Sequence, residues 1–307
     1  MEAMEGKKSF FKDNIVYLMM SKKIIVLILL FFFLFGCSSK NIQTVTNFAD
    51  DINEELSELP EEFNNIEELP VNDFDSNSVT LFIANWNLQI FGQSKAGKSE
   101  LMDYYVEQID DYNIVVIQEI RDKAETAFPQ LCKMLPDYKC IVSTRAGTTS
   151  SKEQYGIIYK DVELVNQFDW NTEEHFNEFE RPPFQATFKR GEWEFTIITI
   201  HTKPGDVPRE MTNLQALLEE KEDEEIIILG DMNLDCSYYK QEKENHFGNW
   251  IWAIPQTEDT TVSQTDCAYD RIIYTPAVEN NFVEYGIMKN VKKEQSDHYL
   301  IWGEFTS

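Results

Sequence analysis

The chain has 307 residues, of which 42% are hydrophobic and 21 are Phe, so it can bury a sizeable core and is not a disordered chain. Its formal net charge is −27, from 54 acidic and 27 basic residues. Broad, sequence-independent binding to a polyanion depends on Lys and Arg neutralising phosphates, and this charge argues against it.

An uncharged run of 13 residues, IIVLILLFFFLFG, extends from Ile24 to Gly36 and follows Lys22 and Lys23. It is too short for a comfortable membrane span and has the length of the apolar region of an export signal. We therefore predict a signal peptide over residues 1–36, and translation starting at Met20 would give that signal better proportions. An N-terminal transmembrane anchor is the alternative.

The next stretch indicates how the exported chain is held. Residues 34–37, LFGC, resemble the lipobox of bacterial lipoproteins, which implies a lipidated Cys37 and anchoring to a membrane of the bacterial cell envelope, on its periplasmic or extracellular face. Residues 37–76 include 11 acids between positions 50 and 75. Few apolar residues there could offset the entropy cost of ordering, so we predict a flexible acidic linker, with a short exposed helix as the alternative.

From residue 78 onward, apolar strand-like runs alternate with amphipathic stretches. This mixture predicts a sandwich of strands and helices, formed by one domain over residues 77–307. The helices are expected near 98–110, 122–135 and 207–221, and the strands at 79–84, 114–118, 139–143, 155–159, 183–188, 193–200, 225–230, 270–275 and 299–305.

Polar side chains stand at the ends of many of these strands. The stretch ILGDMNLDC, residues 228–236, passes from an apolar run directly into acids. Taken alone, each such residue reads as an ordinary turn residue or a solvated strand end. Together they favour a hard-metal site fixed by rigid strand ends, whereas His175 and His246 read as surface residues. The set comprises Asn87, Glu119, His201, Asp231, Asn233, Asp270, Asp297 and His298.

Seven blocks, in order, resemble the endonuclease/exonuclease/phosphatase superfamily, and within it the deoxyribonuclease I-like branch. The resemblance extends from Thr80 to Phe305 and implies an α+β fold, a four-layered sandwich of two packed mixed β-sheets flanked by helices. The blocks are IANWNLQIFG, YNIVVIQEIRD, SSKEQYGIIY, TIHTKPGD, LGDMNLDCSYY, DTTVSQTDCAYDRIIY and SDHYLI.

The resemblance also implies roles for single residues. Two catalytic histidines, each oriented by a carboxylate, act with an Asp-x-Asn pair, and a Mg²⁺ (or Mn²⁺) ion is held nearby. The implied catalytic residues are Glu153, His201, Asp231, Asn233, Asp270 and His298, the metal ligands are Asn87, Glu119 and Asp297, and the DNA contacts are Arg121, Lys152, Arg181, Ser237 and Tyr238.

Two further features concern stability. Export permits disulfides, and Cys132, Cys140, Cys236 and Cys267 allow three pairings, while their spacing argues against a zinc site. The resemblance implies the pairing Cys236–Cys267. It also places a structural Ca²⁺ loop at Asp259, Thr261, Ser263 and Thr265, for which an ordinary polar loop is the alternative.

The predicted chemistry is phosphodiester hydrolysis. A cation can neutralise the phosphate, one His can take a proton from water, and the other can give one to the leaving 3′ oxygen. The family's DNA-reading loop has Arg and Tyr where this chain has Thr148 and Ser151, and Arg145 is a candidate substitute.

We predict an exported, lipid-anchored monomeric endonuclease that cuts double-stranded extracellular DNA to 5′-phosphate products. One alternative is a phosphodiesterase or phosphatase of the same superfamily that acts on sphingomyelin or phosphoinositides. The other is a catalytically silent binding lipoprotein.

Overall fold

The computed structural model describes residues 79–307, apart from 149–150, 176 and 242. The predicted signal peptide, the lipidated Cys37 and the acidic linker lie outside the described residues. Within the described part, no helix has the length and apolar character needed to cross a membrane.

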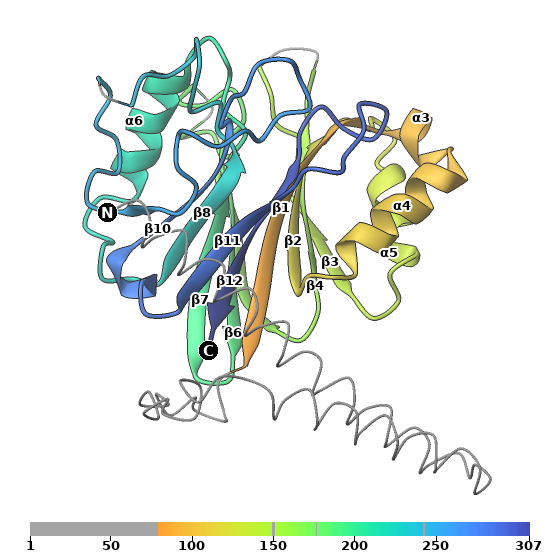
Figure 1. Ribbon diagram of the computed structural model, residues 1–307, viewed down its shortest axis with the longest axis horizontal. Coiled ribbons are helices and arrows are strands. Elements are labelled where there is room, and N and C mark those ends of the chain that lie inside the picture. Colours follow the sequence, from red (N-terminus) through yellow and green to blue (C-terminus); the bar gives the residue numbers. More distant parts are fainter. Residues whose placement is uncertain (1–78, 149–150, 176, 242) are drawn as a thin grey trace, which may run out of the picture. The chain divides into compact units, whose positions relative to one another are not determined.

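Two six-stranded sheets form the centre of the domain (Figure 1). The pairs β1–β2 and β7–β8 are parallel and the other pairs are antiparallel, so both sheets are mixed. The first sheet has the order β11 (Phe282–Met288), β12 (Leu300–Thr306), β1 (Thr80–Phe91), β2 (Ile114–Ile120), β4 (Gln154–Tyr159), β3 (Lys139–Val142). The second has the order β5 (Glu163–Asp169), β6 (Phe184–Arg190), β7 (Trp193–Thr199), β8 (Ile226–Asp231), β10 (Asp270–Tyr274), β9 (Ile251–Trp252).

Helices cover the outer faces of both sheets. α3 (Gln93–Ala96), α4 (Ser99–Ile109) and α5 (Ala127–Lys133) cover the first sheet, and α6 (Val207–Leu217) covers the second; η2 (Pro276–Val278) is a short 3₁₀ turn. Helix, sheet, sheet and helix thus form four layers, as predicted from the sequence.

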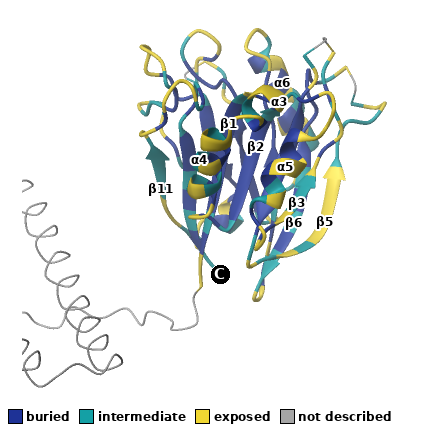
Figure 2. Ribbon diagram, turned by 90° about the vertical axis from the view of Figure 1, so that its right-hand side faces the viewer, coloured by how far each residue is buried: buried dark blue, intermediate teal, exposed yellow. Residues whose placement is uncertain are grey.

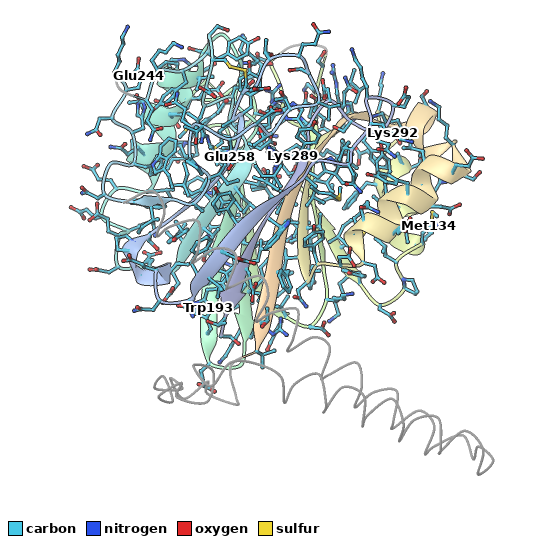
Figure 3. The ribbon with its side chains drawn as sticks, in the orientation of Figure 1. Met134, Trp193, Glu244, Glu258, Lys289 and Lys292 are labelled. Carbon is cyan, nitrogen blue, oxygen red and sulfur yellow. A yellow bond between two sulfur atoms is a disulfide. The ribbon has the colours of Figure 1, made fainter. Side chains whose placement is uncertain are left out.

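The central strands are apolar on both faces because each sheet is covered on both sides. In β1, Leu81 and Ile83 face the second sheet, whereas Ala84 and Trp86 pack with residues of α4. The core between the sheets also contains Trp193, which stacks on Phe195 with ring centroids 4.2 Å apart at the lower end of the sandwich (Figure 3). Each fully buried aliphatic side chain contributes about 1.5–3 kcal/mol to stability.

Three strands were not predicted, namely β5, β9 and β11. β5 is an exposed edge strand, as its colour in Figure 2 shows, and its sequence ELVNQFD has neither a continuous apolar run nor a clean alternation. β1 also extends past the predicted residue 84 to Phe91, with an irregularity between Asn87 and Phe91. Edge strands with one solvated face give weak sequence signals, which explains the misses.

The cysteines form two disulfides, Cys132–Cys140 and Cys236–Cys267. The pairing implied for Cys236 and Cys267 is therefore confirmed. The first bridge joins α5 to β3, and the second joins the loop after β8 to the loop before β10.

The chain order differs between the two sheets. The second sheet is built from one continuous stretch, β5 to β10, whereas the first takes β1 to β4 from before that stretch and β11 and β12 from after it. The late strand β12 lies between β11 and β1.

Candidate active site

The strand directions bring the predicted polar residues to one end of the sandwich. Asn87 and Glu119 lie near the carboxyl ends of the parallel strands β1 and β2, while His201 and Asp231 lie at the carboxyl ends of the parallel strands β7 and β8. His298 shortly precedes β12, which is antiparallel to β1, so it reaches the same edge.

Gly230 allows the close approach of β8 to the segment that carries His201. An added Cβ atom at position 230 would lie 2.1 Å from the carbonyl oxygen of Ile200, a distance at which the backbone would have to move. A residue with a side chain at this position would push His201 and Asp231 apart.

Two buried histidines each pair with a buried carboxylate. Nδ1 of His201 lies 2.9 Å from Oε2 of Glu153, and Nδ1 of His298 lies 2.7 Å from Oδ2 of Asp270. The Nε2 atoms of the two rings lie 3.3 Å and 3.4 Å from the same oxygen, Oδ2 of Asp231. Each imidazole is therefore fixed on one side by a carboxylate and directed with its other nitrogen toward a shared centre.

Each of the two His–carboxylate pairs joins the two sheets. Glu153 precedes β4 and His298 precedes β12, both in the first sheet, whereas His201 follows β7 and Asp270 begins β10 in the second. The third link runs from Nδ2 of Asn87 in β1 to Oδ2 of Asp231 in β8, at 2.9 Å. The site exists only where the sheets are packed together.

The electrostatics favour charged imidazoles. Burial alone would lower the pKa of His298, but Asp270 and Asp231 outweigh it and raise that pKa to about 10. For His201, burial and the nearby Arg181 lower the pKa, while Asp231 and Glu153 raise it and prevail. Burial raises the pKa of Asp231, yet His298 and His201 bring the net value below the usual range. The shared carboxylate therefore stays ionised between two rings that can carry protons.

The carboxylates near Asn87 suit a divalent cation. Nδ2 of Asn87 lies 3.3 Å from Oε1 of Glu119, and Nε2 of Gln89 donates to Oδ2 of Asp297 at 2.9 Å. The other oxygen of Asp297, Oδ1, is buried and has no hydrogen-bond partner among the described residues. An unsatisfied buried carboxylate oxygen is costly unless a cation or water meets it.

A second group of possible ligands lies beside this one. One ligand atom from each of Asp231, Asp270 and His298 falls within 4.8 Å of the others, and all three residues are buried. This buried Asp/Asp/His cluster is consistent with a divalent-metal site.

Comparison with known proteins decides the family. A model of the Endonuclease/Exonuclease/phosphatase family matches residues 84–298. The chain belongs to this family. Human deoxyribonuclease-1 is 32% identical over 259 residues, which cover 73% of this chain and 92% of the relative. Chicken (Gallus gallus) deoxyribonuclease-1 is 32% identical over 231 residues, with coverages of 68% and 82%.

Solved structures of the family share the fold. A mannosyl-6-phosphatase from Bacteroides thetaiotaomicron superposes with a TM-score of 0.57 at 18% identity and covers 73% of this chain and 99% of its own. An endonuclease/exonuclease/phosphatase family protein from the same organism gives a TM-score of 0.56 at 17% identity, with coverages of 75% and 98%. At such identities the likeness concerns the fold alone, and it confirms the predicted architecture.

The predicted DNA contacts of this family member differ in accessibility. Lys152, Ser237 and Tyr238 are exposed, and Arg121 is partly buried, with its Nη1 atom 3.8 Å from Oε2 of Glu119. Arg181 is buried, and its guanidinium donates to the carbonyl oxygens of His201 and Thr202 at 2.9 Å and 3.1 Å and to Glu153 at 3.4 Å. These contacts favour support of the Glu153–His201 pair, and a DNA contact by Arg181 stays a prediction.

Two other predicted features are engaged in contacts within the protein. Arg145 donates to the carbonyl oxygens of Asp122 and Lys152. Oδ1 of Asp259 accepts from the amide of Thr261 at 3.0 Å and from its hydroxyl at 3.1 Å, as a polar loop without an ion would. Calcium binding there stays a prediction.

Sequence reasoning missed the residues that support the site from inside. Nδ2 of Asn85 lies 3.4 Å from Oδ1 of Asp270, and Gln118 donates to Asn85 and, at 3.0 Å, to the hydroxyl of Thr199. The sequence feature that could have identified Asn85 and Gln118 is an amide side chain inside an otherwise apolar strand. Glu210 of α6 accepts from the amides of Glu180 and Lys203, and as an acid in an amphipathic helix it gave no signal.

Proposed function

We propose that this protein is an exported, divalent-metal-dependent endonuclease that hydrolyses phosphodiester bonds of DNA and leaves 5′-phosphate ends. One observation carries the proposal. Two buried His–carboxylate pairs converge on Asp231 Oδ2 at 3.3 Å and 3.4 Å, so a proton acceptor and a proton donor lie close enough together to act on one phosphate. The deoxyribonuclease-1 relatives support DNA as the substrate.

The two histidines have different surroundings. The guanidinium of Arg181 lowers the pKa of His201 and so partly offsets its carboxylate neighbours. Asp270 and Asp231 raise the pKa of His298 to about 10. Of the two rings, His201 is therefore the one that loses its proton more easily, and we assign it, in its neutral form, as the base that takes a proton from the attacking water. His298 then gives its proton to the 3′ oxygen as the bond between phosphorus and that oxygen breaks. Asp231 and Asn233 orient the water and the phosphate, and Glu153 and Asp270 orient the two rings.

The carboxylates supply a place for the cation. Glu119, Asn87 and Asp297 would hold Mg²⁺ (or Mn²⁺), which when bound neutralises the phosphate and stabilises the charge of the transition state. Arg121, Lys152, Ser237 and Tyr238 would contact the DNA, and Asp259 and Thr261 would hold a structural Ca²⁺.

We extend the proposal to the cellular location. Two disulfides fit an oxidising compartment outside the cytosol. The signal peptide over 1–36, the lipid anchor at Cys37, the linker over 37–76 and the catalytic domain over 77–307 remain parts of this proposal, as does a monomeric state.

Plasmid nicking tests the function. We expect the purified protein with Mg²⁺ to relax supercoiled DNA, and we expect EDTA to stop the reaction. His201→Ala and His298→Ala should each lower kcat by about 10²–10⁴-fold, the usual contribution of a proton-transfer group. His175→Ala is the matched control, because His175 pairs with Glu178 outside the site. Intact plasmid beside hydrolysis of sphingomyelin or an inositol phosphate would assign the protein to another phosphodiesterase class, and no hydrolysis of any substrate would indicate a binding protein.

A further inference from the structure

Two consecutive residues of β1 adopt left-handed backbone conformations beside the candidate metal ligands. Gln89 has φ 44° and Ile90 has φ 55°, within the irregular part of β1 between Asn87 and Phe91. For a β-branched residue such as Ile, a positive φ is a genuine outlier that costs free energy. Such conformations persist only where the surroundings impose them, and they cluster at functional sites.

Hydrogen bonds to the site explain the backbone conformation. The amide of Ile90 donates to Oε2 of Glu119 at 2.8 Å, and the amide of Gln89 donates to Oδ1 of Asn87 at 2.8 Å. In both bonds, positions 89 and 90 contribute only the main-chain amide. Gly or Asn at position 90 would supply the same amide with less strain, so the bonds do not explain why the side chain is Ile.

The Ile90 side chain is also unusually exposed. At 57%, it is the most exposed large hydrophobic residue in the described part of the chain. A single exposed apolar residue is ordinary on a protein surface. This one combines exposure with a strained backbone and with an amide 2.8 Å from a candidate metal ligand, and that combination requires a reason.

The second sheet presents an exposed ring next to the same site. Tyr238, in the loop after β8, is 38% exposed and lies against Tyr269, with ring centroids 5.5 Å apart. Tyr269 in turn lies beside His298, with ring centroids 6.5 Å apart. Apolar surface is thus available around a polar centre. In a chain of net charge −27, few Lys and Arg side chains are available to bind the phosphates of DNA. Apolar contacts to its sugars and bases can supply affinity for DNA instead.

We propose that Ile90 is a substrate-contacting residue that packs its side chain on the deoxyribose and base edge next to the cleaved phosphate. The proposal rests on the proposed function as a DNA endonuclease. Apolar side chains, Ile among them, are used by minor-groove-binding proteins to contact bases of duplex DNA. The bonds to Glu119 and Asn87 fix the backbone in the strained conformation and hold the side chain toward solvent beside the site.

The test compares Ile90→Asn and Ile90→Gly with the wild-type protein in Mg²⁺. Both variants keep the amide that Glu119 accepts and relieve the strained φ, so Tm should rise by about 2–4 °C. We expect KM for a duplex oligonucleotide to rise about five- to tenfold, because part of an apolar contact is lost. The kcat/KM for bis(p-nitrophenyl) phosphate, a diester without sugar or base, should change less than twofold. Ile90→Val should keep the KM of the wild-type protein for the duplex.

Glu220→Gly is the matched control for strain. Glu220 is exposed, has φ 63° and lies beyond the end of α6, far along the chain from Ile90. Its replacement should raise Tm in the same direction and leave KM for the duplex unchanged.

Two results would overturn the role of Ile90. An unchanged KM for the duplex in both variants would show that the side chain makes no contact with substrate. An equal loss on the duplex and the small diester would show that position 90 acts through Glu119. Failure of the endonuclease proposal looks different, because the wild-type protein itself would then leave the duplex intact.

Discussion

Side chains from three different segments approach a single carboxylate oxygen, Oδ2 of Asp231. Nδ2 of Asn87 lies 2.9 Å away, and Nε2 of His201 and of His298 lie 3.3 Å and 3.4 Å away. Burial raises the pKa of this acid, but the two imidazoles bring it below the usual range. The protonation of the two rings therefore depends on one charge that belongs to neither pair.

Removing that charge should shift the histidine titrations. In Asp231→Asn, the pKa of His298 should fall from about 10 in the wild-type protein, because one of the two carboxylates that raise it is lost. The pKa of His201 should fall as well. NMR titration of the imidazole C–H signals in EDTA measures both. Glu163→Gln, at the exposed end of β5 away from the site, should leave them unchanged. A wild-type pKa for His298 in Asp231→Asn would contradict the proposed coupling.

Residues at strand ends were predictable because strand direction places them at one edge. Asn85 and Gln118 were not, because their importance depends on which strands of the other sheet lie opposite, and sequence spacing does not specify that. The burial of Arg181 could not be predicted from the sequence for the same reason, since its partners His201 and Thr202 follow a different strand.

Among the helices, α5 is stabilised at its N-terminus by a residue that lies outside it. It has seven residues, with Pro129 in its first turn, and a helix of this length is marginal by itself. The carboxylate of Asp122 accepts from the amides of Thr126 and Ala127 at 2.7 Å and 2.9 Å, where the helix leaves its first donors free. The sequence predicted a helix over 122–135 but could not show that its first residues form the cap.

Replacing this cap should destabilise the protein. We expect Asp122→Ala to lower the free energy of unfolding by about 1–2 kcal/mol, measured by urea denaturation at pH 7. Asp103→Ala, on an exposed face of α4, is the control and should change it little. A loss no larger than that of the control would contradict the capping role.

The same carboxylate gives a pH dependence with a definite sign. Burial raises the pKa of Asp122, but the amides of Thr126, Ala127 and Ala124 and the Thr126 hydroxyl hold it below the usual range. The stabilisation is therefore present above the unfolded-state pKa of about 3.9 and is lost as the pH falls through the lower folded-state pKa. In Asp122→Asn, this part of the acid sensitivity should disappear.

In the molecule as a whole, each disulfide lies within one half of the sandwich. Cys132–Cys140 joins α5 to β3, a strand of the first sheet, and Cys236–Cys267 joins two loops next to strands of the second sheet. The two sheets are therefore held together by their shared core and the polar contacts of the site, without a bridge between them in the described part of the chain.

The two bridges should differ in their effect on stability. They close loops with sequence separations of 8 and 31 residues. In the chain-entropy model, loss of the shorter bridge costs about 2.5 kcal/mol and loss of the longer about 3.7 kcal/mol. Urea unfolding of the two double Cys→Ala variants measures both values. The reverse order would show that structure in the unfolded chain, rather than loop length, sets the effect.

The position of β12 has a consequence for how the protein is made. This strand lies in the interior of the first sheet, between β11 and β1, although it is the last strand in chain order, and His298 directly precedes it. A ribosome synthesises the chain from its N-terminus, so β1 lacks one neighbour and the site lacks one imidazole until the segment with His298 and β12 has been made. A growing chain that has not yet reached His298 therefore lacks the complete candidate site, so any chemistry of this site must wait for the last of the described strands to be made.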